Sequence, residues 1–184
     1  CITEKLVVEG TNGTVAKELS TTDRDEEIID LISKTATEAF LSLGYEDGPG
    51  HAELILMNNG KVGMVEVAGR GGGYMVADKL VPLSSGINVN SLSCQLAVNE
   101  VIQKIEIKKQ NTVLRFFPSI HGRVVGMYGF NEANLIKGIE ASSFVKKGQI
   151  FRNAHTDGDR LGYILSNAKT LQEAKDLADK AESL

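Results

Sequence analysis

Two carboxylates that could hold a metal ion, Glu53 and Glu66, flank Asn59-Gly60, a dipeptide typical of a two-residue hairpin turn. A turn at these two residues places Glu53 directly opposite Glu66 on the neighbouring strand. Like charges that face each other repel, and burial raises the cost of ionising them. A divalent cation such as Mg²⁺ would remove both penalties, because hard cations bind carboxylate oxygens and often share their shell with substrate phosphates.

The same turn fixes the other partners in the hairpin. Ile55 is expected to face Met64, and Leu54 is expected to face Val65. Apart from the two carboxylates both faces are apolar, which is typical of a sheet that is covered on both sides.

Arg70 and three glycines follow the second carboxylate. Alternation along an extended strand places Arg70 on the same face as Glu66, where its guanidinium could bind a phosphate or form a structural ion pair with a carboxylate. Backbone N–H groups of a glycine run can approach an anion closely. The pattern therefore indicates a site for a metal-bound polyphosphate; an ordinary hairpin with one salt bridge is the alternative. The residues expected to bind phosphate or substrate are Arg70, Gly71, Gly72, Gly73 and Tyr74, although Tyr74 could equally be a half-buried tyrosine without a role.

Several motifs of the chain together resemble the ATP-grasp enzymes. The first two are Gly48-Pro49-Gly50-His51-Ala52-Glu53 and Val65-Glu66-Val67-Ala68-Gly69-Arg70-Gly71-Gly72. Within that superfamily the chain is most similar to carboxylate–amine ligases of the L-amino-acid ligase type. The shared ending is Phe116-Phe117-Pro118, Gly122-Arg123-Val124-Val125 and Gly158-Asp159-Arg160-Leu161-Gly162-Tyr163.

The resemblance implies a ligase that uses ATP and Mg²⁺, with Mn²⁺ able to replace it, to activate a carboxylate as an acyl phosphate. An amine then attacks to form an amide or peptide bond. Glu53 and Glu66 would be the metal ligands, and Arg70 the catalytic residue that stabilises the transferred phosphoryl group. One alternative is a bicarbonate-activating enzyme of the biotin carboxylase or carbamoyl-phosphate synthase type. A non-catalytic nucleotide-binding module is the other.

Ala68 departs from the pattern of some ATP-grasp families, which have an asparagine there as a further metal ligand. Because alanine cannot bind a metal, the site is expected to depend on Glu53, Glu66, phosphate oxygens and water. The L-amino-acid ligase type commonly has a small residue at this position, so the departure favours that type.

Composition argues against several classes of partner. The 20 basic and 24 acidic residues give a net charge of −4, and no basic block points to nucleic acid. No apolar run has membrane-spanning length. Two cysteines, Cys1 and Cys94, are too few for a disulfide framework and indicate the cytoplasm, with Cys94 expected in a helix core. The expected partners are therefore a nucleotide and small carboxylate and amine substrates.

Periodicity and capping signals predict the elements that position the site. One helix is expected from Thr22-Asp23 to Gly44, and a second from Asn88 or Asn90 to about Gln103. Asn131 is expected to cap a short helix. Thr170 opens the last helix with Glu173 in a capping box. Strands are expected over residues 2–8, 112–117, 123–130, 142–146 and 161–165.

These elements predict an α+β fold. The resemblance specifies it as the C-terminal subdomain of an ATP-grasp domain, an antiparallel sheet with packed helices, followed by a small α+β cap. The lysine-rich stretch 104–110 suggests a boundary between domains 1–103 and 104–184. The family's glycine-rich lid and phosphate-binding lysines are not recognisable here. The chain is thus expected to be the C-terminal portion of a longer enzyme, inactive alone, whose cap could also form a homodimer contact.

Overall fold

The computed structural model describes all residues 1–184 and divides them into two units. The sheet unit comprises residues 3–22 and 109–184 together with Cys1, and the hairpin unit comprises residues 23–108 together with Ile2. Residues 3–22 therefore pack with the C-terminal part of the chain. The domain boundary at 103/104 stays a prediction.

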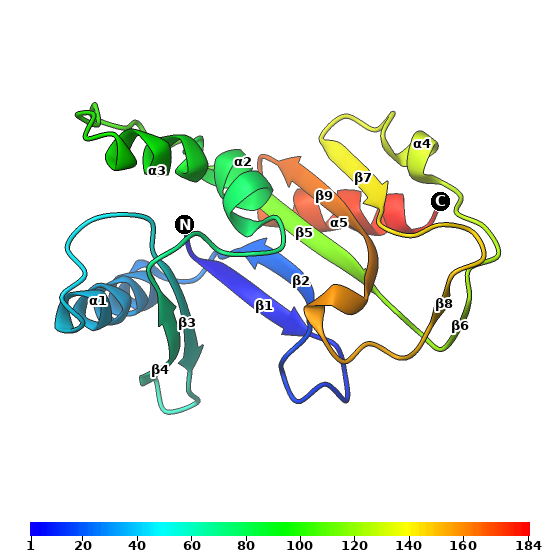
Figure 1. The fold of residues 1–184 in the computed structure, drawn as a ribbon, viewed down its shortest axis with the longest axis horizontal. Helices are drawn as coiled ribbons and strands as arrows, with labels where there is room; N and C mark the ends of the chain where they lie inside the picture. Colours follow the sequence, from blue (N-terminus) through cyan, green and yellow to red (C-terminus); the bar gives the residue numbers. More distant parts are fainter. The chain divides into compact units, whose positions relative to one another are not determined.

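The sheet unit is built on a five-stranded antiparallel sheet in the order β1-β2-β5-β9-β7 (Figure 1). A two-stranded ribbon, β6 with β8, two short elements, α4 and η2, and the last helix, α5, complete it. The strands are β1 (Thr3–Val7), β2 (Ala16–Thr21), β5 (Asn111–Pro118), β6 (Gly122–Arg123), β7 (Ile139–Ser143), β8 (Ile150–Phe151) and β9 (Arg160–Ala168). The helices are α4 (Phe130–Ala133), the 3₁₀ turn η2 (Asp157–Asp159) and α5 (Leu171–Glu182).

Helix α5 covers one face of this sheet (Figure 1). Its apolar stripe, including Ala174 and Ala178, packs on Val113 of β5 and Ile164 of β9 in one buried core. The predicted capping box is confirmed, because Thr170 Oγ1 accepts from the Glu173 N–H and Glu173 accepts from the Thr170 N–H.

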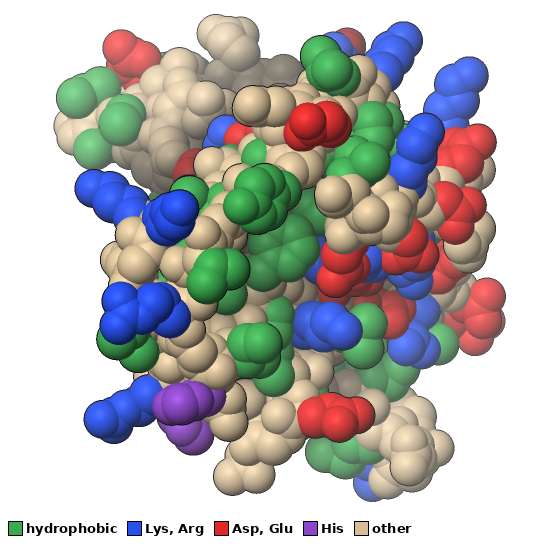
Figure 2. All heavy atoms as spheres, turned by 90° about the vertical axis from the view of Figure 1, so that its right-hand side faces the viewer, with side chains coloured by type: hydrophobic (Ala, Val, Ile, Leu, Met, Phe, Trp, Pro, Cys, Tyr) green, Lys and Arg blue, Asp and Glu red, His purple; other side chains and the backbone are tan.

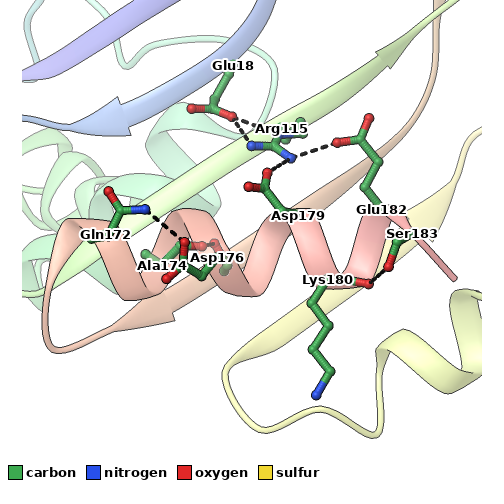
Figure 3. A network of polar contacts seen from close by, with 10 residues as sticks. Glu18, Arg115, Gln172, Ala174, Asp176, Asp179, Lys180, Glu182 and Ser183 are labelled. Carbon is green, nitrogen blue, oxygen red and sulfur yellow. Dashed lines mark hydrogen bonds and ion pairs between the residues drawn. The ribbon is translucent and has the colours of Figure 1, made fainter.

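An ion-pair network fixes α5 to the strands (Figure 3). The nearly buried Arg115 of β5 contacts Glu18 of β2 at 2.7 Å, Asp179 at 2.6 Å and Glu182 at 2.7 Å. Burial alone would lower the pKa of Arg115, but hydrogen bonds to Asp179 and Glu18 outweigh it and raise the pKa above its usual range. Arg115 is therefore charged at any working pH and joins two strands and a helix.

The hairpin unit contains four helices and one two-stranded hairpin (Figure 1). The hairpin is β3 (His51–Leu56) with β4 (Val62–Ala68), and α1 (Glu26–Ser42) contacts both strands. The others are a π-helix, η1 (Val76–Leu80), then α2 (Val81–Ser85) and α3 (Val89–Ala97). Ile55, Met57 and Val65 are exposed, so the expected covering of the hairpin on both sides is not present within this unit.

The predicted α+β class, an antiparallel sheet with packed helices, is confirmed. Asn88 caps α3 as expected, since its Oδ1 accepts from the Ser91 N–H at 2.9 Å. Other local predictions were wrong. Helix α1 starts at Glu26, after Asp25, Gly129 rather than Asn131 precedes α4, and Cys94 is exposed.

The predicted strand over residues 123–130 is also wrong beyond its first residue. Only Gly122 and Arg123 pair with β8, and the following residues line a hollow instead. No helix of the chain is both long enough and apolar enough to span a membrane.

Candidate functional site

The two carboxylates predicted as metal ligands lie directly opposite each other: Glu53 of β3 is the cross-strand partner of Glu66 of β4. The turn between the strands is not the predicted one. The Gly60 N–H donates to Met57 O at 2.9 Å, and the Met57 N–H donates to Lys61 O at 2.8 Å, which makes a three-residue loop. Gly60 has φ +77° but Asn59 has no positive φ, whereas a two-residue type I′ turn needs both.

The longer loop shifts the pairing near the turn by one residue. Leu54 faces Met64 and Ile55 faces Gly63, so both predicted pairs beyond the carboxylates were wrong. An irregularity beside Val65 then inserts one extra residue into β4. This bulge restores the register that pairs Glu53 with Glu66.

Arg70 follows β4 and lies beside the second carboxylate. Its Nη2 is 3.5 Å from Glu66 Oε1, and its Nη1 donates to Gly71 O at 3.1 Å. The structural ion pair, one of the two alternatives for Arg70, is therefore present. More than half of each side chain stays exposed, so this pair contributes little to stability and leaves the guanidinium accessible to an anion.

The glycine run packs closely against Val76 and Ala77, and its backbone N–H groups have no hydrogen-bond acceptor in the protein. A Cβ on Gly71 would lie 2.8 Å from Ala77 Cβ, and one on Gly72 would lie 2.8 Å from Val76 Cγ1, so both positions need glycine. Gly73 has open space around it. The N–H groups of these three glycines make no hydrogen bond to the protein, which leaves them available to an anion.

Tyr74 and Met75 both have left-handed backbones, with φ of 44° and 67°. Residues other than glycine adopt this backbone conformation at a cost in free energy, and residues held in it cluster at functional sites. The π-helix η1 begins immediately afterwards, and π-helical turns are also frequent at functional sites. The half-exposed Tyr74 is thus held in a costly conformation.

The carboxylate pair has the chemistry of a Mg²⁺ site. Mg²⁺ is usually bound by one or two carboxylates together with substrate phosphates rather than by a full protein cage. No cluster of three or more His, Cys, Asp or Glu side chains that could hold a metal ion is present. His51 Nε2 lies 3.6 Å from Glu53 Oε1, because residues two apart on a strand lie on the same face.

Polar residues of the C-terminal motifs stabilise turns. Asp159 Oδ2 accepts from the His155 and Thr156 N–H groups and from Thr156 Oγ1, and these bonds lower the pKa of Asp159. Arg160 donates to Asp157 at 2.6 Å and lies 3.7 Å above the Phe116 ring. The sequence did not predict an apolar hollow of about 470 Å³ beside the β6–β8 ribbon, since its lining comes from distant segments.

Comparison with protein families matches residues 115–184 to L-amino acid ligase C-terminal domain 2. No curated protein matches the chain. This match confirms the predicted resemblance to the L-amino-acid ligases over residues 115–184.

Solved structures share the fold across nearly the whole chain. L-amino acid ligase from Bacillus licheniformis has 23% identity and a TM-score of 0.81, with 91% of this chain and 43% of that chain covered. Phosphoribosylglycinamide synthetase from Anaerococcus prevotii has 19% identity and a TM-score of 0.74, with 98% and 46% covered.

N5-carboxyaminoimidazole synthase from Aspergillus clavatus, in complex with ADP and 5-aminoimidazole ribonucleotide, has 16% identity and a TM-score of 0.67, with 99% and 46% covered. The chain thus spans less than half the length of these three structures.

Proposed function

We propose that the complete protein joins a carboxylate to an amine at the expense of ATP. Two findings support this: residues 115–184 match the L-amino acid ligase C-terminal domain 2 family, and the fold of the chain is that of the ATP-grasp ligases. The carboxylate oxygen attacks the γ-phosphorus of ATP, and ADP leaves. The amine then attacks the acyl carbon, phosphate leaves with that oxygen, and an amide or peptide bond forms. We also place this protein in the cytoplasm, in agreement with its two free cysteines.

The observation that carries the proposal is the pairing of Glu53 with Glu66 next to three unused glycine N–H groups. A carboxylate pair offers little to an anionic nucleotide by itself, so it needs a cation between the two. When bound there, Mg²⁺, or Mn²⁺ in its place, would neutralise charge on the phosphates. Bound ADP in a solved structure with this fold agrees with ATP as the nucleotide.

The residues of the chain have separate tasks in this proposal. Glu53 and Glu66 hold the metal. Arg70 turns from Glu66 toward the transferred phosphoryl group, where its planar fork stabilises negative charge. The N–H groups of Gly71, Gly72 and Gly73 donate to phosphate oxygens, and Tyr74 contacts the carboxylate substrate.

The test is release of ADP and phosphate by the complete protein, with Mg²⁺ and a panel of amino acids and small carboxylates. We expect release that needs both a carboxylate and an amine, and that falls by about 10²-fold or more in Glu66→Gln. Glu46→Gln, an exposed carboxylate that precedes β3, is the matched control and should keep activity. Release that needs only bicarbonate would favour the carboxylase type, and nucleotide binding without turnover would favour a binding module.

A further inference from the structure

Tyr45 contacts both strands at the open end of the β3–β4 hairpin that carries the candidate site. Its hydroxyl donates to Pro49 O at 2.8 Å, just before β3 begins. Its ring packs on Gly69, directly after β4, where a Cβ would lie 2.7 Å from Tyr45 Cε2. The side chain therefore joins the segment that leads into Glu53 to the segment that leads into Arg70.

The end of helix α1 holds Tyr45 in place. The Tyr45 N–H donates to Phe40 O at 3.1 Å, and the centroids of the two rings are 5.4 Å apart. The Phe40 ring in turn packs on Gly50, where a Cβ would lie 2.7 Å from Phe40 Cζ. Because its backbone, its ring and its hydroxyl all have partners, Tyr45 forms a fixed support beneath the hairpin.

A tight turn at Gly69 sets the direction in which the chain leaves β4. The Arg70 N–H donates to Ala68 O at 2.8 Å, which makes a three-residue turn with Gly69 at its centre. The guanidinium of Arg70 then lies 3.5 Å from Glu66 Oε1. The Tyr45 ring packs on the middle residue of this turn, so a shift of the ring changes the direction of Arg70.

We propose that Tyr45 is a positioning residue for Arg70 in the ligase reaction, an inference that rests on the proposed function of the site. The ion pair of Arg70 with Glu66 is more than half exposed and holds the guanidinium only weakly. The backbone beneath Arg70 is what Tyr45 fixes. Without that support the guanidinium is misplaced, and a misplacement of about 1 Å can cost about 10²-fold in rate.

Steady-state kinetics of the complete protein with ATP, Mg²⁺, a carboxylate and an amine test the proposal. We expect Tyr45→Leu to lower kcat by about 10-fold or more with a smaller change in KM for ATP, since Arg70 acts on the transferred phosphoryl group. Tyr45→Phe keeps the ring on Gly69 but loses the bond to Pro49, so its kcat should lie between those of Tyr45→Leu and the wild type.

Gly69→Ala tests the same contact from the other side. Its methyl group would meet Tyr45 Cε2 at 2.7 Å and should also lower kcat. Tyr45→Leu removes that atom, so the double variant should lose less activity than the product of the two single effects. Single effects that simply multiply would contradict the coupling between Tyr45 and the turn.

Hydrogen exchange at the Arg70 N–H gives a measure that does not depend on catalysis. This N–H donates to Ala68 O, so its exchange should become about 10-fold faster or more when Tyr45→Leu loosens the turn. Unchanged exchange in this variant would overturn the proposal. So would an unchanged kcat in Tyr45→Leu when Arg70→Met is inactive. A wild-type protein without turnover would instead refute the ligase function, and exchange would still decide whether Tyr45 fixes Arg70.

Tyr128→Leu is the matched control. Tyr128 is 82% exposed and belongs to the sheet unit. The segment between β6 and α4, which contains it, lies on the side shown in Figure 2, where exposed hydrophobic side chains lie among charged ones of both signs. The control should alter neither kcat nor the exchange of the Arg70 N–H.

Discussion

Glu53 and Glu66 face each other across β3 and β4 because two departures from a regular hairpin cancel. The three-residue loop at Gly60 moves the strands by one residue, and the bulge beside Val65 moves them back. A bulge leaves one residue unpaired and bends the strand, so it has a cost, and bulges are common next to active sites. The pairing of the two carboxylates is consistent with a function that requires it.

Gly60→Ala tests the loop that sets this register. Gly60 has φ +77°, and a Cβ added there would have no atom within 4 Å, so the only cost of a methyl group is the left-handed backbone. We expect a loss of about 1 kcal/mol in the free energy of unfolding, measured with urea. Gly73→Ala is the matched control, because Gly73 has open space and no positive φ. Equal losses in the two variants would contradict the loop geometry.

Tyr74 allows the strained backbone and the ring to be tested separately. Tyr74→Gly and Tyr74→Ala both remove the ring, but only glycine adopts φ 44° without strain. The Gly variant should therefore be more stable than the Ala variant by about 1 kcal/mol in urea unfolding. Both should raise KM for the carboxylate substrate to a similar extent. An unchanged KM would remove Tyr74 from the substrate site.

Arg115 is expected to dominate the stability of the sheet unit. Its loss leaves Glu18, whose side chain is only 7% exposed, as an unpaired charge. Arg115→Met should therefore cost about 3–5 kcal/mol in the free energy of unfolding. Asp179→Asn should cost about 1 kcal/mol or less, since Asp179 is 66% exposed.

A double variant separates the charge from the packing. Glu18→Leu in the Arg115→Met background removes the orphaned carboxylate and should recover part of the loss. A double variant as unstable as Arg115→Met alone would assign the loss to packing of the Arg115 side chain.

Asp159 should make stability depend on pH in the acid range. Hydrogen bonds from the His155 and Thr156 N–H groups, and from Thr156 Oγ1, lower its pKa in the folded state. Its contribution is therefore complete above the ordinary carboxyl pKa of about 4 and is lost as pH falls through the lower folded value. Unfolding in urea from neutral to acid pH should show a shallower decline in Asp159→Asn than in the wild type. Parallel pH profiles would contradict this role.

Local signals in the sequence predicted the features that depend on neighbouring residues. The Thr170 capping box and the Asn88 cap each follow from side chains a few residues apart. The opposition of Glu53 and Glu66 was predicted from a two-residue turn that is absent, and it holds because the bulge beside Val65 offsets the three-residue loop. The turn type was missed because it depends on whether Asn59 adopts a positive φ, which Asn tolerates but does not require.

Features that depend on distant segments were not predictable in the same way. Residues 124–130 alternate like a strand, but the backbone hydrogen bonds to the neighbouring segment end at Val124, which pairs with Gly148 and Gln149. Strand β2 pairs with β5 across about half of the chain, an association that no local pattern encodes. Cys94 follows the apolar spacing of its helix and is nevertheless exposed in this structure.

The most direct test of the central claim is to follow oxygen from the substrate. The carboxylate substrate that supports ADP release is labelled with ¹⁸O and given to the complete protein with ATP, Mg²⁺ and the amine. Activation as an acyl phosphate predicts one ¹⁸O atom in each released phosphate, seen by mass spectrometry, and no label in AMP. Phosphate without ¹⁸O, or label in AMP, would contradict the proposed ligase chemistry.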